Sequence, residues 1–208
     1  GFSIPESTIH KNLEKIIKNV PGRLIIGTFA SQFERIIKIV EVAEKHGKKV
    51  VTEGRSIKTK IEIAQLAGLL KPKKDTIIAA QDIDKYPPEK ILILATGAQG
   101  EEFAALMRMA NKKHKYISFT PRDTIILSSS VIPGNETSVQ KLKDNLYRHK
   151  LHIIHYRVSD VHSTGHGNAG ELTWVNKMVG ARYFMPSYGY YSMLMVHAQA
   201  VVEAGVMK

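Results

Sequence analysis

The chain has 208 residues, of which 43% are hydrophobic and 24% charged, proportions typical of a folded globular protein that exclude general disorder. It contains no cysteine, which excludes a disulfide scaffold, a thiolate zinc site and a cysteine nucleophile. Thirty Lys and Arg residues against 19 Asp and Glu give a net charge of +11, which favours a polyanionic partner.

Charge alone leaves two interpretations open, a nucleic-acid partner or a well-solvated basic surface. The lack of cysteine fits a reducing compartment, and no apolar run reaches the roughly 20 residues that a membrane span needs. We therefore expect a cytoplasmic protein with no membrane partner. The first residue is Gly1 rather than Met, so we also expect a piece of a longer protein.

Short apolar runs alternate with longer amphipathic segments along the chain. In chain order these patterns predict helix 7–19, strand 23–29, helix 31–46, strand 48–52, helix 59–70, strand 77–78, strand 91–95, helix 101–111, strand 123–128, helix 136–148, strand 151–156, helix 169–179, strand 183–185 and helix 192–204. Ser31 and Glu34 have the spacing of a capping box. Strands that are apolar throughout and separated by single helices indicate an α/β fold, with a Rossmann-like parallel β-sheet flanked by helices on both faces.

Ligands of such sheets bind where loops leave the carboxyl ends of the strands. Two of these loops are chemically unusual. The loop 96–100 has two glycines before a helix, which suits either an anion or an ordinary tight turn. The run Ser128-Ser129-Ser130 offers three hydroxyls, which suit either a phosphate or a capping and turn segment.

Five histidines between residues 149 and 166 raise the question of a metal site. His152 and His155 are three apart on a predicted strand, so they face opposite sides of it. His162 and His166 share a loop, but no further cluster of His, Asp and Glu completes the three ligands that a zinc hydrolase needs. These residues therefore predict no metal site.

Taken together and in this order, the loops resemble the β-CASP domain of the metallo-β-lactamase superfamily, most closely that of ribonuclease J. The segments that carry the resemblance are Gly1-Phe-Ser-Ile-Pro-Glu6, Gly27-Thr-Phe-Ala-Ser31, Glu53-Gly-Arg-Ser56, Thr96-Gly-Ala-Gln-Gly-Glu101, Ser128-Ser-Ser-Val-Ile-Pro-Gly-Asn-Glu136, Val161-His-Ser-Thr-Gly-His-Gly167 and Tyr183-Phe-Met-Pro186. Each is weak alone, but seven in register span the whole chain.

The resemblance implies a zinc-dependent ribonuclease in which the β-CASP domain is inserted into a catalytic lactamase-like domain and clamps single-stranded RNA over the metals. Residues 1–158 would form the β-CASP domain, and 159–208 would be the segment that returns into the metallo-β-lactamase domain. The chain lacks the His-x-His-x-Asp-His metal motif. We therefore expect no cofactor in this chain, zinc in a complete family member, the missing catalytic domain as a partner, and no hydrolysis by the isolated chain.

Three family positions carry over to numbered residues. The acidic residue of the first β-CASP motif falls on Glu6 and the histidine of the second on His166. The resemblance implies that the two contact each other, so that the carboxylate orients an imidazole able to donate a proton to the leaving oxygen. A zinc-ligating histidine of the family is replaced by Tyr188, and a phenol is a poor substitute for imidazole at zinc.

The resemblance also implies contacts with RNA phosphates. The implied contact residues are Ser128, Ser129, Ser130, Thr164, Gly165, Gly167, Arg55 and Arg35. In the stretch that ends at Arg35, the family usually has Asn and His where this chain has Gln32 and Glu34.

Three functional hypotheses remain open. The first is a segment of a ribonuclease J-like enzyme, and the second is a non-catalytic RNA-binding or assembly module of a degenerate paralogue, in which Tyr188 records lost activity. The third is a Rossmann-like small-molecule enzyme, against which the absence of a GxGxxG fingerprint counts. The apolar tail at 193–196 further predicts self-association as a possible homodimer.

Overall fold

The computed structural model describes residues 1–102, 104–155, 159–163 and 166–206. Contacts divide the chain into two compact units. One unit is Glu6–His162, and the other joins Gly1–Pro5 to Ser163–Lys208. The domain boundary expected between 158 and 159 stays a prediction, because residues 156–158 lie outside the described part of the chain.

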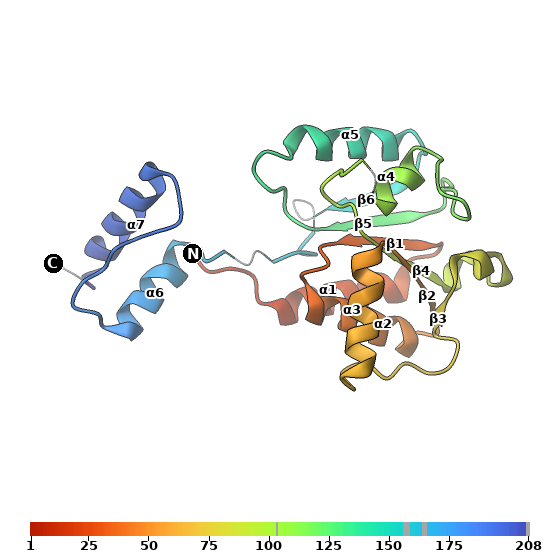
Figure 1. Cartoon of the computed structure of the whole chain (residues 1–208), viewed down its shortest axis with the longest axis horizontal. Coiled ribbons are helices and arrows are strands. Elements are labelled where there is room, and N and C mark those ends of the chain that lie inside the picture. The colour runs from red at the N-terminus through yellow and green to blue at the C-terminus, as the bar shows by residue number, and fades with distance from the viewer. Residues whose placement is uncertain (103, 156–158, 164–165, 207–208) are drawn as a thin grey trace. The chain divides into compact units, whose positions relative to one another are not determined.

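The Glu6–His162 unit is built on a sheet of six parallel strands in the order β3-β2-β4-β1-β5-β6 (Figure 1). This confirms the predicted parallel α/β fold. Three of the strands, β1, β4 and β5, are buried along their whole length, as apolar strands covered on both faces should be. The strands are β1 Leu24–Thr28, β2 Lys49–Glu53, β3 Ile77–Ile78, β4 Ile91–Ala95, β5 Thr124–Ser128 and β6 His152–His155.

Helices cover both faces of this sheet, as Figure 1 shows. Successive strand residues point to opposite faces, so Leu24 and Ile26 pack in one apolar cluster while Ile25 packs in the other. The first cluster is completed by α1 Glu6–Asn19, α2 Phe33–Lys45 and α3 Arg55–Leu66, and the second by α4 Ala105–Ala110 and α5 Glu136–Tyr147. Two short 3₁₀ helices, η1 Ala80–Lys85 and η2 Pro88–Lys90, connect β3 to β4.

The strand order determines which loops meet. β1 lies between β4 and β5, and its register pairs Thr28 with Ser128. From β1 the chain crosses to β2 on one side, whereas from β4 it crosses to β5 on the other. The carboxyl ends of β1, β4 and β5 therefore form the kind of topological switch point at which α/β sheets bind ligands.

The second unit consists of the chain's first residues and two helices, α6 Ala169–Val179 and α7 Tyr191–Glu203. α6 begins with a capping box of Asn168 and Glu171, whose carboxylate also accepts a hydrogen bond from Ser3 at 2.8 Å. The N–H of Gly170 donates to the carbonyl of Gly1 at 3.1 Å. These bonds attach the N-terminal segment to α6 within this unit.

Two predicted local structures are wrong. The capping box of Ser31 and Glu34 does not form, because a turn closed by the Gln32 N–H and the Phe29 carbonyl delays the start of α2 to Phe33. The described residues 181–190 form no strand, because a strand requires a hydrogen-bonded neighbour and this segment pairs with none.

Among the predicted helices, the bounds of those at 59–70 and 101–111 differ most from the structure. α3 begins at Arg55, four residues early, directly after Gly54, which ends the strand with a φ of 108°. α4 begins late, at Ala105, because the Glu101 carboxylate and carbonyl accept bonds from Gln99 and Ala104 in a turn that precedes the helix. None of the helices in the described ranges is long and apolar enough to cross a membrane.

Candidate functional site

The most connected polar residue at the carboxyl edge of the sheet is Arg35, on the first turn of α2. Its side chain is 1% exposed, and its Nε and Nη2 each donate to a carboxylate oxygen of Glu6 at 2.6 Å. Nη1 donates to His162 Nδ1 at 2.9 Å and to the carbonyl and Oγ of Ser128 at 3.4 and 3.3 Å. One guanidinium thus joins α1, the end of β5 and the segment around residue 162.

These contacts set the protonation of the site. Burial raises the pKa of Glu6, but hydrogen bonds and charge from Arg35 outweigh it and hold that pKa below its usual value. Burial, with the Arg35 charge, lowers the pKa of His162 to about 4. Because a guanidinium only donates, His162 Nδ1 must be an acceptor and the imidazole is neutral with its proton on Nε2.

The three serines at the end of β5 and directly after it have different environments. Ser128 is fully buried, and its hydroxyl donates to the Val161 carbonyl at 2.6 Å. Ser129 is 5% exposed, whereas Ser130 is partly exposed. The run therefore turns from the interior towards the surface, and Ser130 is its most accessible member.

Gln99 holds this serine loop in place, a role that the sequence did not reveal. Its side chain is 3% exposed, and its Nε2 donates to the Ser130 carbonyl at 2.7 Å and to Ser129 Oγ at 3.4 Å. Its Oε1 accepts from the Ile132 N–H at 2.8 Å. The sequence feature that could have revealed this role is the large amide side chain of Gln99 in a glycine-rich loop, because a small residue would suffice there for a turn.

The loop 96–100 forms a closed turn. The N–H of Gln99 donates to a Glu101 carboxylate oxygen at 3.2 Å, and that of Gly100 donates to the Gly97 carbonyl at 3.0 Å. Because these N–H groups bond within the protein, the geometry favours the ordinary turn over the anion site for this loop.

Arg55 lies at the first position of α3 and is exposed. It lines a cavity of about 580 Å³ together with Lys60, Arg108 and Thr96. Unlike Arg35, which is paired with Glu6, these cations line an open cavity. Three cations around one cavity form an electropositive region at the carboxyl edge of the sheet.

The remaining predicted residues belong largely to the second unit. His166 and Gly167 are exposed there, while Glu6 belongs to the other unit, so their expected contact stays a prediction. Thr164 and Gly165 lie outside the described residues.

The described part of the chain offers no group of three or more His, Cys, Asp or Glu that could hold a metal ion. Tyr188, the position that the resemblance assigns to a zinc ligand, is 99% exposed and adopts a φ of 64°. A fully exposed phenol does not fit the donor set of a zinc site.

Comparison with known proteins agrees with this architecture. The model of the family "Ribonuclease J, beta-CASP domain" matches residues 21–146. The chain is 36% identical over its whole length to Ribonuclease J 1 of Streptococcus pyogenes and 38% identical over 99% of its length to Ribonuclease J of Mycoplasma pneumoniae. It is also 31% identical over its whole length to Ribonuclease J2 of Bacillus subtilis.

The matches cover 37%, 36% and 37% of these three relatives, so the chain spans about a third of each. The match to the family model covers more than half of the chain and includes strands β1 to β5 of the parallel sheet. The chain belongs to the ribonuclease J family, through its β-CASP domain.

Proposed function

We propose that this chain is the RNA-holding part of a ribonuclease J-like, zinc-dependent phosphodiester hydrolase, and that it binds single-stranded RNA by its phosphates. Membership of a ribonuclease family and a net charge of +11 support this proposal. In it, the zinc ions and most of the catalytic groups belong to residues outside this chain, so the isolated chain binds RNA in the cytoplasm without hydrolysing it.

The observation that carries the proposal is the serine loop held by Gln99 at the switch point of the sheet. Hydroxyls on a loop that a buried amide holds in place suit contacts with a phosphate backbone, and Arg55 adds an exposed cation at the same edge of the sheet. We assign RNA contact to Ser129, Ser130, Arg55 and the loop 164–167.

Glu6 and Arg35 receive different roles in this proposal. Both carboxylate oxygens of Glu6 accept bonds from Arg35, so Arg35 is a positioning residue for Glu6 rather than a phosphate contact. The hydroxyl of Ser128 donates to the Val161 carbonyl, so Ser128 is likewise a positioning residue rather than a phosphate contact. Glu6 and His166 remain the proposed acid–base pair of the complete enzyme.

The test is binding of 5′-monophosphorylated single-stranded RNA at a series of salt concentrations, measured by fluorescence anisotropy. Affinity should fall steeply with salt, because phosphate contacts release counterions. The double variant Ser130→Ala, His166→Ala should bind about ten-fold more weakly, through loss of two hydrogen-bonding groups.

The matched control is Ser118→Ala, His152→Ala, which removes the same side chains from exposed positions at the opposite, amino-terminal end of β5 and β6. It should bind as the unaltered chain does. Equal affinity of the two double variants would contradict the assignment of the carboxyl edge as the RNA site.

Tyr188 favours a second candidate, a non-catalytic RNA-binding module of a degenerate paralogue. Its exposed phenol stands where the family resemblance places an imidazole ligand. Tyr188→His in the complete protein discriminates the two: RNA hydrolysis by the unaltered protein supports the enzyme, whereas hydrolysis gained only with the histidine supports the degenerate module.

A further inference from the structure

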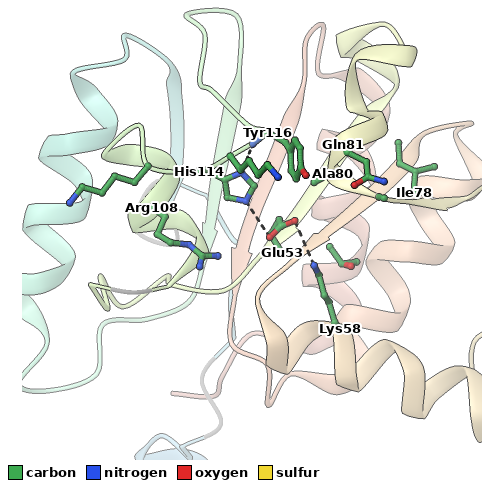
Figure 2. A pocket seen from close by; sticks show the side chains of 12 residues that line it. Glu53, Lys58, Ile78, Ala80, Gln81, Arg108, His114 and Tyr116 are labelled. Carbon is green, nitrogen blue, oxygen red and sulfur yellow. Dashed lines mark hydrogen bonds and ion pairs between the residues drawn. The ribbon is translucent and has the colours of Figure 1, made fainter.

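A second cavity, of about 480 Å³, opens at the carboxyl ends of β2 and β3 in the Glu6–His162 unit (Figure 2). Its walls come from the end of β2, the segment after β3 and residues 113–116 after α4. The charged side chains that line it are Glu53, Lys58, Arg108, Lys113 and Lys115. Neither the serine loop nor the Glu6–Arg35 pair belongs to this cavity.

The carboxylate of Glu53, the last residue of β2, is the most unusual group in this cavity because the residue is only 7% exposed. His114 Nε2 lies 3.2 Å from its Oε2. His114 Nδ1 accepts the N–H groups of Tyr116 and Ile117 at 3.3 and 3.1 Å, which places the imidazole proton on Nε2. A neutral histidine therefore donates to Glu53 and fixes its orientation.

The other carboxylate oxygen, Oε1, forms an ion pair with Lys58. Lys58 Nζ lies 3.7 Å from it, beyond hydrogen-bonding distance. Figure 2 shows the Glu53 carboxylate between His114 and Lys58. A buried, oriented carboxylate oxygen of this kind suits a ligand hydroxyl, because a hydrogen bond to a charged acceptor is stronger than one to a neutral acceptor.

The rest of the cavity favours an anion. Four cationic side chains and one carboxylate line it, and the imidazole of His114 is neutral. Lys115 lies 4.9 Å from the centre of the Tyr116 ring, so an aromatic face stands beside the cations. This set of groups matches a nucleotide, with cations for the phosphate, a carboxylate for a sugar hydroxyl and an aromatic ring. In dinucleotide-binding sheets an acidic residue likewise binds a ribose hydroxyl.

We propose that this cavity binds one ribonucleoside 5′-monophosphate unit, either free or within an RNA strand. Arg108 and the lysines bind its phosphate, and Glu53 Oε1 accepts the ribose 2′-hydroxyl. Arg108 also lines the neighbouring cavity that contains Arg55, so the two electropositive cavities adjoin. This site is separate from the proposed RNA contacts of the serine loop and does not depend on them.

The test is calorimetric titration of the full chain with adenosine 5′-monophosphate, its 2′-deoxy analogue and inorganic phosphate. The ribonucleotide should bind about ten-fold more tightly than the deoxynucleotide, through the charge-assisted hydrogen bond to Glu53. Glu53→Gln should abolish most of this difference while leaving the affinity for the deoxynucleotide within about two-fold.

A second variant keeps the test decisive if Glu53→Gln fails to fold. Lys58→Ala, Arg108→Ala alters two exposed side chains and should weaken binding of both nucleotides about ten-fold. The control Lys141→Ala, Arg148→Ala removes the same two side-chain types from exposed positions within and directly after α5 and should have no such effect.

A competition experiment with oligoadenylate distinguishes a free nucleotide from a nucleotide within an RNA strand. If the oligomer displaces the mononucleotide, the site takes a residue of an RNA strand; if it does not, the site takes a free nucleotide. The proposal is overturned if the ribonucleotide binds no more tightly than phosphate, or if the Lys58, Arg108 variant binds as well as its control. The serine-loop variant leaves this cavity intact, so either proposal can fail alone.

Discussion

At the scale of single residues, Arg35 shows how burial changes a role. An arginine near a glycine-rich loop is a natural candidate for a phosphate contact, but this one is 1% exposed and bonds to Glu6, Ser128 and His162. A buried cation must be paired, and here the pairing neutralises Arg35 while it orients the carboxylate. Arg55, in contrast to Arg35, is exposed and lines an open cavity.

His162 gives a prediction at this scale. Its pKa in the folded chain is about 4 against an ordinary 6.5, so the unfolded state binds the proton more readily. The stability that depends on neutral His162 is complete above pH 6.5 and is lost as the pH falls towards 4. Urea unfolding should show a loss of about 1 to 2 kcal/mol from this group between pH 6.5 and 4.5.

His162→Gln serves as the comparison, because glutamine does not titrate. Its stability should vary less with pH across the same window, although it is lower at pH 7 through the lost packing. Glu6, whose pKa is also lowered, is present in both proteins, so the comparison of the two removes its contribution. Parallel stability curves for the two proteins would contradict the neutral, buried imidazole.

At the scale of elements, the turn between β4 and α4 packs its backbone directly on α5. Gly100 has a φ of 75°, and a Cβ there would overlap the backbone carbonyl of Ser138. Gly100→Ala should therefore lower the free energy of unfolding by about 3 kcal/mol, from backbone strain and the displaced helix.

Gly134 supplies the control for this prediction. It has a φ of 96°, but nothing lies within 4 Å of where its Cβ would be. Gly134→Ala should lower the free energy of unfolding, measured with urea for both variants, by only the backbone strain of about 1 kcal/mol. Similar losses for the two variants would mean that contact with α5 contributes nothing at Gly100.

At the scale of the whole molecule, the second unit leaves much of its apolar surface exposed. The exposed fractions in and before α7 are 79% for Tyr190, 77% for Tyr191, 59% for Met193, 52% for Met195 and 65% for Val196. A patch of this kind marks an interaction surface or an association hazard. In a chain that spans about a third of its relatives, we expect it to drive self-association when the chain is alone.

Analytical ultracentrifugation tests this expectation. The unaltered chain should associate with rising concentration, and Met193→Lys, Met195→Lys should shift it towards monomer by about ten-fold or more in dissociation constant. Leu66→Lys, at an 88% exposed position on α3, should leave the association unchanged. A monomer at all concentrations would contradict the prediction.

The predictability of the fold and of the site differs for a physical reason. Strands such as 91–95 were predictable because burial on both faces requires apolar residues throughout, and that requirement is local in sequence. The capping box at Ser31 was predicted wrongly because a turn between Phe29 and Gln32 competes with it. The segment 183–185 has strand-like composition, but its environment offers no partner strand.

The sequence by itself determined the α/β class, the parallel sheet and the loops at its carboxyl edge, since apolar periodicity and turn residues are properties of neighbouring positions. Only the tertiary structure decided that Arg35 is buried on Glu6, that Gln99 holds the serine loop, and that Glu53 and His114 meet across a cavity. These pairs are distant in the chain, and packing alone decides which side chains lose water and must find a partner.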